Sequence, residues 1–371
     1  MHVKIINNKD LINNEQHVTF EKNKHMKTYI KTIVSTLVVL LAFSCSDNSS
    51  SSGSGSTINA EYAYITDGTD LKIIDITVPT APTLVNSIAV NTSYFVSVSP
   101  DVAYVAQYDA TEPYLSIVDI SNVAAPSIQA EIQKSNTLAF SLLSDMYMVN
   151  NVAYLTDVYR GLHVVDIASF NFTSQLNSGG DAMSLTKVQN ELFVIDQANG
   201  LHSYDVTTPG TPTATGTTNT ADIDTASYGD APFGQYHSWV ETDGTYLFVA
   251  NTIDKKIKQF DAATLTLVNE VNIEGYPTAF AIHNGNAYVT MKASANAPLQ
   301  NSSDSVRMYD LATLSLQDMK ILSRSSGVAL NGNYAYVTDA NGLHIYDISG
   351  NDFVLESSLG TGFGNFIALG Q

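Results

Sequence analysis

One short segment is repeated seven times along this chain, and the repeat constrains the fold more than any other feature. Its last copy, residues 334–349, is an aromatic-led apolar stretch, a turn, and a second apolar stretch ending in Asp-Ile-Ser. The aromatic residue recurs at Tyr64, Tyr104, Tyr154, Phe193, Phe248, Tyr288 and Tyr336. The closing Asp recurs, at spacings of 37 to 56 residues, at Asp75, Asp119, Asp166, Asp205, Asp261, Asp310 and Asp347.

The repeat predicts an all-β fold. Its apolar stretches are short, rich in β-branched and aromatic residues, and bounded by Gly, Asn, Asp and Pro, which is typical of strands. A period in the forties favours one blade of four antiparallel strands per repeat. In the second repeat these strands, named A to D in chain order, are expected at residues 95–99, 103–107, 115–120 and 127–132. Seven repeats therefore predict a seven-bladed β-propeller.

The two ends of the repeat array predict how the ring closes. The chain ends on an A-like strand, residues 365–369, that no B, C or D strand follows. The array begins with a B-like strand, residues 58–66, that has no A strand before it. We expect the C-terminal strand to complete blade 1, because pairing the two halves leaves no free strand edge between blades.

The repeated polar residues are expected to be structural. An Asp at a strand end, followed by Ser or Thr, readily accepts hydrogen bonds from backbone N–H groups two residues further on. His163, His202 and His344 occupy one repeat position, in Gly-Leu-His. We interpret them as packing or hydrogen-bonding residues, with metal ligation as the alternative.

The residues before the repeats divide into two parts. Residues 1–44 read as an upstream segment plus a signal peptide, for which Met26 is the expected true start, since a basic region and an apolar run at 32–43 follow it. The run is too short to span a membrane. A small residue directly before Cys45, the one cysteine, predicts a lipoprotein signal with Cys45 as the lipidated residue. The alternative is a plain secretory signal with an incidental cysteine.

Charge and composition limit the partners. Residues 45–57 are a Ser/Gly-rich tether, and residues 58–371 form the propeller. The formal net charge is −19, so the basic surface that nucleic acid requires is missing. Contact with a membrane is expected through the N-terminal lipid alone. We therefore expect an exported protein anchored to the outer membrane, with the cell surface as its placement.

The repeat core resembles the LVIVD-repeat family of bacterial surface proteins. Residues 115–121, Leu-Ser-Ile-Val-Asp-Ile-Ser, and 162–167, Leu-His-Val-Val-Asp-Ile, carry the likeness. It is clearest in blades 1 to 4 and 7, whereas 257–264 looks more like lactonase-like and surface-layer propellers. The resemblance implies a β-propeller, often lipid-anchored, with no agreed activity, and its motif marks a blade and no site.

Departures from the repeat predict where a site lies, because repeat proteins carry function on insertions. The D-to-A connection at 217–236 and the B-to-C connection at 291–303 are long, and strand direction places both on one face of the ring. Tyr side chains offer flat apolar surface with a polar tip. The predicted ligand-binding residues on this face are Tyr108, Tyr159, Arg160, Tyr228, Tyr236 and His237.

Two chemical alternatives involve the same face. Asp222, Asp224 and Asp230 would suit Ca²⁺, although their spacing is not that of an EF-hand. The plainer interpretation is a solvated acidic loop, and we expect no cofactor. His237 is the alternative catalytic residue, as the base of a channel-centred hydrolase or lactonase-like enzyme.

These observations lead to three functional hypotheses. The first is a non-enzymatic binding module that takes a protein or glycan ligand on the insertion-bearing face. The alternative is the hydrolase, which metal ions would assist. A purely structural surface-layer component is the third.

Overall fold

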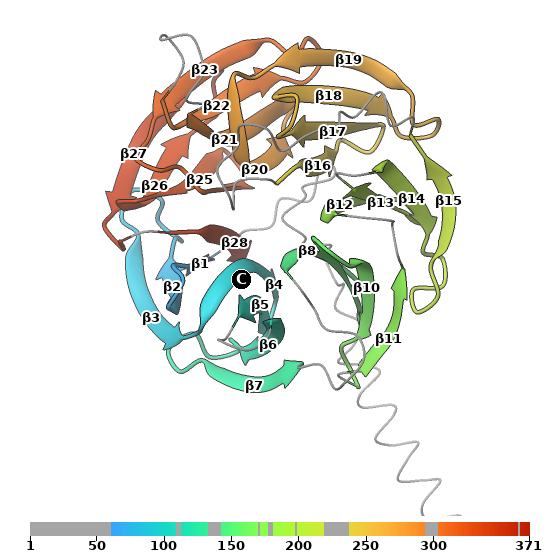
Figure 1. Cartoon of the computed structure of the whole chain (residues 1–371). Coiled ribbons are helices and arrows are strands. Elements are labelled where there is room, and N and C mark those ends of the chain that lie inside the picture. Colours follow the sequence, from blue (N-terminus) through green and yellow to red (C-terminus); the bar gives the residue numbers. More distant parts are fainter. Residues whose placement is uncertain are drawn as a thin grey trace, which may run out of the picture. The chain divides into compact units, whose positions relative to one another are not determined.

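The computed structural model describes residues 61–108, 113–132, 142–169, 171–176, 181–196, 199–218, 237–293, 303–362 and 364–371. These residues belong to one compact unit and form seven four-stranded antiparallel sheets and no helix. The sheets are arranged as blades around a central axis (Figure 1). The predicted all-β, seven-bladed propeller is confirmed.

Each blade runs from an inner A strand to an outer D strand. In A-to-D order, blade 1 consists of β28 (Phe366–Gly370), β1 (Tyr62–Thr66), β2 (Asp70–Asp75) and β3 (Thr83–Ala89), and blade 2 of β4 (Thr92–Ser99), β5 (Val102–Tyr108), β6 (Pro113–Asp119) and β7 (Ser127–Ile132). Blade 3 consists of β8 (Leu143–Val149), β9 (Val152–Asp157), β10 (Gly161–Asp166) and β11 (Asn171–Leu176). Blade 4 consists of β12 (Ala182–Val188), β13 (Glu191–Asp196), β14 (Gly200–Asp205) and β15 (Thr213–Thr217). Blade 5 consists of β16 (Trp239–Thr242), β17 (Tyr246–Asn251), β18 (Lys256–Asp261) and β19 (Leu267–Asn272). Blade 6 consists of β20 (Gly275–His283), β21 (Asn286–Ala293), β22 (Ser305–Asp310) and β23 (Leu316–Ile321). Blade 7 consists of β24 (Gly327–Asn331), β25 (Tyr334–Asp339), β26 (Gly342–Asp347) and β27 (Val354–Leu359).

The antiparallel order fixes which connections share a face. Since neighbouring strands alternate in direction, the D-to-A and B-to-C connections leave from the same edge of every blade, as expected from the sequence. Blade 6 differs from its predicted bounds, because β20 begins at Gly275 and β21 continues to Ala293, past the predicted loop start. Gly275 permits this extension, since a Cβ there would lie 2.8 Å from the Lys292 carbonyl oxygen.

The hydrophobic core lies between the blades. The buried apolar residues form seven clusters, and each cluster joins two neighbouring blades. The repeated aromatic of strand B is at most 5% exposed in all seven blades, which confirms its packing role. Each blade is therefore stabilised by its neighbours more than by its own sheet.

The repeated Asp residues cap the turn between strands C and D. In every blade the carboxylate accepts a hydrogen bond from a backbone N–H two or three residues further on, at 2.7–2.9 Å. At Asp119 the hydroxyl and the backbone N–H of Ser121 hold the carboxyl pKa below its usual range. The structural interpretation of this residue is confirmed.

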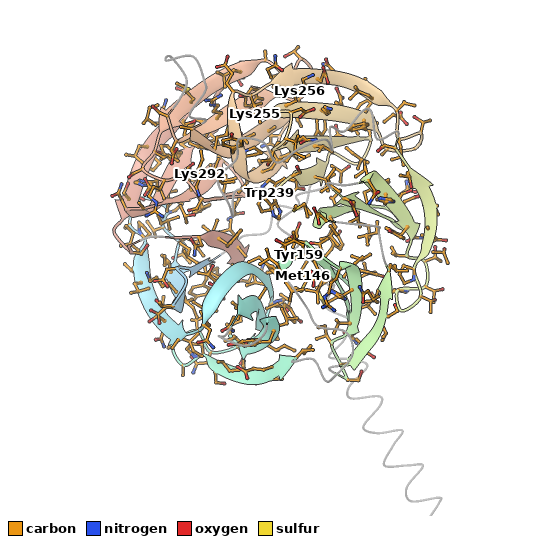
Figure 2. The ribbon with its side chains drawn as sticks, viewed as in Figure 1. Met146, Tyr159, Trp239, Lys255, Lys256 and Lys292 are labelled. Carbon is orange, nitrogen blue, oxygen red and sulfur yellow. The ribbon has the colours of Figure 1, made fainter. Side chains whose placement is uncertain are left out.

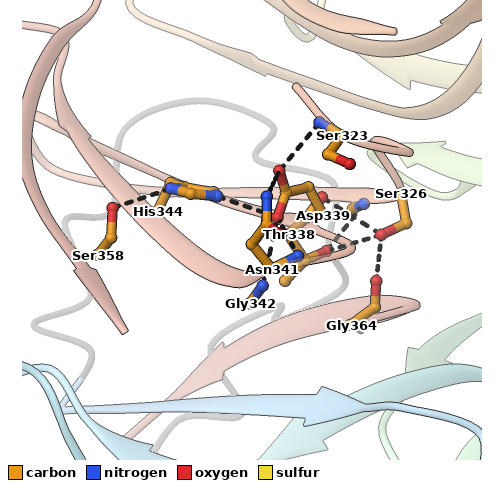
Figure 3. Close-up of polar contacts among 10 residues, drawn as sticks. Ser323, Ser326, Thr338, Asp339, Asn341, Gly342, His344, Ser358 and Gly364 are labelled. Carbon is orange, nitrogen blue, oxygen red and sulfur yellow. Dashed lines mark hydrogen bonds and ion pairs between the residues drawn. The ribbon is translucent and has the colours of Figure 1, made fainter. Parts of the chain in front are cut away.

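The repeated histidine position is a structural pairing position. His163 lies 3.0 Å from Asp157, and His344 lies 3.0 Å from Asp339, the Asp that ends strand B of the same blade. In blade 7, Asp339 also accepts hydrogen bonds from the backbone N–H groups of Ser323 and Asn341 (Figure 3). Burial opposes the charge on Asp339, but these contacts outweigh it and hold the Asp339 pKa below its usual range. The expected hydrogen-bonding role is confirmed.

The C-terminal strand closes the ring. β28 pairs antiparallel with β1, with Tyr62 opposite Gly370 and Thr66 opposite Phe366. Ile367 packs into the cluster between blades 7 and 1, and Ala368 into the cluster between blades 1 and 2. The Ser326 hydroxyl of blade 7 donates to the Gly364 carbonyl just before β28 (Figure 3). One strand therefore completes a sheet and two of the seven blade interfaces.

Truncation after Gly362 should destabilise the whole ring, because it removes β28 and opens both interfaces. We expect the melting temperature of the full chain to fall by many degrees and its transition to broaden. Thermal unfolding followed by circular dichroism measures this, with removal of the exposed Gln371 alone as the control. Identical melting of the two truncations would contradict the closure.

Candidate functional site

Several predicted site residues lie outside the described residues. These are Cys45 and the members of the 217–236 connection, namely Tyr228, Tyr236, Asp222, Asp224 and Asp230. Tyr108 is placed by its backbone at the end of β5, opposite Pro113. Of the predicted residues, His237, Tyr159 and Arg160 are described in full.

Tyr159 and Arg160 form the turn between β9 and β10. The Asp157 carboxylate accepts the Tyr159 backbone N–H at 3.1 Å, and the Arg160 carbonyl accepts the Gln175 side-chain amide at 2.6 Å. The Tyr159 side chain is 64% exposed and, in the view of Figure 2, is drawn near the centre of the ring. The B-to-C connection of blade 3 therefore carries an exposed aromatic ring.

His237 lies two residues before β16, so the strand begins slightly later than predicted. Its imidazole stacks on the Trp239 indole with ring centroids 4.0 Å apart. Burial lowers the His237 pKa to about 3, so the ring is neutral at physiological pH. A base with so low a pKa is poorly matched to proton abstraction near neutrality.

Three side chains, those of His237 just before β16 and of Trp239 and Glu241 within it, each carry a buried polar atom without a hydrogen-bond partner in the described part of the chain. His237, Trp239 and Glu241 alternate along the chain, so they point to the same side of the strand. His237 Nε2, Trp239 Nε1 and Glu241 Oε2 are each buried without a hydrogen-bond partner among the described residues. Such atoms are rare in folded proteins, and each requires an explanation.

The row on β16 lies at the inner rim of the ring. Trp239 packs against the cluster between blades 5 and 6 and the cluster between blades 6 and 7, which a residue near the axis can reach together. Figure 2 shows its indole toward the centre of the ring. The Trp239 indole therefore lies toward the axis.

Asp145 of blade 3 reaches the same region. One of its carboxylate oxygens accepts the Ser184 hydroxyl of blade 4 at 2.7 Å and the Leu185 backbone N–H at 3.2 Å. The Ser184 oxygen in turn accepts the Val240 backbone N–H of blade 5 at 3.4 Å. Hydrogen bonds thus link the inner strands of three consecutive blades.

Asp145 and Glu241 are two carboxyls with raised pKa values in this region. Glu241 is 5% exposed, whereas Asp145 is only half-buried. Burial raises the Asp145 pKa to about 6, although its three hydrogen bonds oppose the shift. Burial, and then the nearby charge of Asp145, raise the Glu241 pKa well above its usual value. We name Asp145, Ser184, His237, Trp239 and Glu241 the axial cluster.

Basic side chains lie beside acidic ones near the B-to-C connections of blades 5 and 6. The Lys255 ammonium lies 4.8 Å from the centroid of the Tyr276 ring, and Tyr276 is opposite Lys292 across β20 and β21. Burial lowers the Lys292 pKa, with opposite influences from Asp304 and Arg324. Lys255 and Lys292 are labelled on neighbouring blades in Figure 2.

Two further observations limit the chemistry. Within the described ranges, no three His, Cys, Asp or Glu side chains are grouped so as to hold a metal ion. The same residues include no helix long and apolar enough to cross a membrane. What the axial cluster offers is an aromatic surface, hydrogen-bonding groups and two carboxyls, which suits binding of a small polar group.

Sequence reasoning found His237 but missed Asp145, Ser184, Trp239 and Glu241. The available signal was an acidic residue inside an inner strand, as in Leu-Ser-Asp-Met-Tyr at 143–147 and Trp-Val-Glu-Thr at 239–242. Charged residues are almost never fully buried unless paired, so these two positions break the pattern of their strands.

The comparison with protein-family models identifies LVIVD repeats at residues 57–90, 93–133 and 324–351. These matches fall on blades 1, 2 and 7, and they confirm the resemblance there. The comparison with curated proteins gives no match.

Solved structures share the fold at low sequence identity. A functionally unknown protein from Desulfotomaculum acetoxidans is 13% identical with a TM-score of 0.60, covering 84% of this chain and 99% of its own. A putative 6-phosphogluconolactonase from Bacteroides fragilis is 12% identical with a TM-score of 0.60, over 85% and 99%. AztD from Citrobacter koseri is 11% identical with a TM-score of 0.54, over 84% and 98%. At these identities the likeness concerns the fold alone.

Glu241→Gln together with Asp145→Asn should stabilise the protein at neutral pH, since both changes remove carboxyls whose ionisation burial opposes. We expect a gain of about 1–3 kcal/mol, the usual cost of a buried group left without its partner. The folded chain holds these protons more tightly than the unfolded chain, so the free energy of unfolding falls as pH rises from about 4.5 through about 6 and above.

The double variant should lose that part of the pH dependence. Thermal unfolding at about pH 5 and about pH 7.5 measures it. Glu131→Gln, an exposed substitution on β7, is the matched control. A double variant that melts at a lower temperature than the wild type at neutral pH would show that the carboxyls stabilise the ring.

Proposed function

We propose that this LVIVD-repeat β-propeller is an exported lipoprotein, anchored to the outer membrane through Cys45, that acts as a non-enzymatic binding module. The ligand, a protein or a glycan, binds on the face formed by the D-to-A and B-to-C connections. The axial cluster lies at or near the starts of the inner strands β8, β12 and β16, where the D-to-A connections enter them, and we take it as the centre of this surface.

The row of unpartnered buried atoms on β16 is the observation that carries the proposal. A buried donor or acceptor without a partner costs free energy, and a ligand that supplies the partner recovers it. His237, Trp239 and Glu241 present three such atoms along one strand. The exposed Tyr159 ring adds a flat surface of the kind that binding sites use.

Binding is favoured over catalysis by the state of His237. A hydrolase centred on the axis would need this side chain as a base, and burial holds its pKa at about 3. Its ring contacts Trp239, and no described carboxylate orients it. A general base needs both a suitable pKa and an orienting partner.

The anchor is tested by Cys45→Ser in the producing cell. We expect the wild type in the membrane fraction, labelled by an alkynyl fatty acid, and the variant unlabelled in the soluble exported fraction. Several acyl chains on one cysteine give stable anchoring, whereas none gives no membrane affinity of this kind. Equal membrane association of both proteins would overturn the lipid anchor.

The binding surface is tested with an array of bacterial envelope glycans and with isolated outer-membrane proteins. Tyr159→Ala and His237→Ala should each weaken binding of the probe that the wild type retains by about tenfold, the loss typical of a central aromatic contact. Asp101→Ala, in the β4–β5 turn on the opposite face, should leave binding unchanged. Equal losses in all three variants would contradict this assignment of the surface.

The alternative Ca²⁺ site is tested by heat stability. The chain is stripped with EDTA, and Ca²⁺, Mg²⁺, Mn²⁺ and Zn²⁺ are returned singly. A native-state ligand at about 100 times its dissociation constant adds about 2.7 kcal/mol. We expect no shift with any metal. A shift with Ca²⁺ that Asp222→Asn and Asp224→Asn abolish would establish a metal site in the 217–236 connection.

A further inference from the structure

The carboxyls of the axial cluster carry the strongest indication of ligand charge. Glu241 is 5% exposed, and its Oε2 has no partner among the described residues. Asp145 is held in place from two sides, by the Ser184 hydroxyl and by the backbone N–H of Met146 at 2.8 Å. Neither carboxyl has a described Lys or Arg as an ion-pair partner. The positively charged partner that buried carboxylates require is therefore left for a ligand to supply.

Trp239 supplies the second element of the site. Its indole is on the same side of β16 as Glu241 and two residues away, a separation of about 6.5–7 Å along a strand. An indole face attracts cations, and it does so more strongly when water is excluded. An aromatic face beside acidic groups is the arrangement that favours an organic cation.

A metal ion fits this site less well. Ca²⁺ takes six to eight oxygen ligands, and the axial cluster brings together two carboxyls and one hydroxyl. Among the described side chains, no group of three metal-ligating residues occurs anywhere in the ring. An alkylammonium group needs only a few acceptors and uses the aromatic face that a metal ion leaves idle.

We propose that the axial cluster binds a small organic amine through its alkylammonium group. The ammonium lies between Glu241 and Asp145, and the adjoining methylene groups lie against the Trp239 indole. This inference rests on the proposed binding function and names the chemistry of its ligand.

Binding changes the protonation of the pair in a defined way. Burial favours the protonated form of Glu241, so a Glu241 carboxyl that holds its proton releases it to solvent on binding and becomes the carboxylate that accepts the ammonium. The groups that contact Asp145 are the Ser184 hydroxyl and the backbone N–H groups of Met146 and Leu185, and none of these titrates. The two carboxyls are therefore the groups whose charge changes. Affinity for the amine should therefore fall as pH is lowered through about 6.

Trp239 is the one tryptophan of the chain, so its fluorescence reports on this site directly. The full-length protein is titrated with putrescine, with 1,4-butanediol, and with succinate, which are similar in length but carry two positive charges, no charge and two negative charges. Ca²⁺ is added separately after EDTA treatment. We expect a saturable change in Trp239 emission with putrescine alone.

The variants test the residues. Glu241→Gln and Asp145→Asn should each weaken the response to putrescine at least about tenfold, whereas Glu131→Gln should leave it unchanged. Circular dichroism verifies that each variant is folded. The pH dependence of the wild-type titration provides a measurement that needs no variant.

The outcomes separate this inference from the proposed function. A saturable response to 1,4-butanediol or succinate, with none to putrescine, keeps a binding site at the axis and overturns its preference for a cation. A response to Ca²⁺ alone replaces the amine with a metal ion. No response to any probe overturns the amine site, while glycan and protein binding at Tyr159 is decided by its own assay.

Discussion

The pairing of β28 with β1 is the contact on which the ring depends. The blades are held by seven apolar clusters that each lie between two sheets, so no blade has a core of its own. β28 contributes to two of these clusters and completes the sheet of blade 1. Closing the ring gives the backbone groups of one strand edge their hydrogen-bond partners, and it also removes apolar surface from water. The inner strands are thereby fixed relative to one another around the axis.

That rigidity makes an unfavourable axial cluster tolerable. Two carboxyls, of which Glu241 carries an unpartnered oxygen, and the unpartnered nitrogens of His237 and Trp239 are costly to bury, and a marginal scaffold would relax around them. Here each inner strand is paired along its length and packed on both sides. Ser184 further ties the Asp145 side chain to the backbone of β16. Buried polar groups that a scaffold retains against their cost are characteristic of binding sites, where a ligand supplies the missing partner.

The seven blades are alike in structure and unlike in surface. The C-to-D turn is capped by an Asp in each blade. In blades 1, 3 and 7 an Asp at the end of strand B pairs with a basic residue of strand C, and in blade 5 Asp254 of the B-to-C turn does so. The basic residues near the B-to-C connections of blades 5 and 6 break this uniformity. So do the inner-strand acids of blades 3 and 5. The repeated residues build the blades, and the residues that depart from the repeat form the candidate binding site.

The sequence by itself determined the blade count, the strand order, the closure and the structural roles of the repeated Asp, His and aromatic residues. These follow from short periodic patterns and from the incomplete repeats at the two ends of the array, which can be recognised in the sequence alone. Only the tertiary structure decided the axial cluster. Asp145 and Ser184 are 39 residues apart, and Ser184 and Val240 are 56 residues apart. Side chains from different blades meet at the axis only after ring closure sets the register and tilt of the inner strands, and no local pattern encodes that geometry.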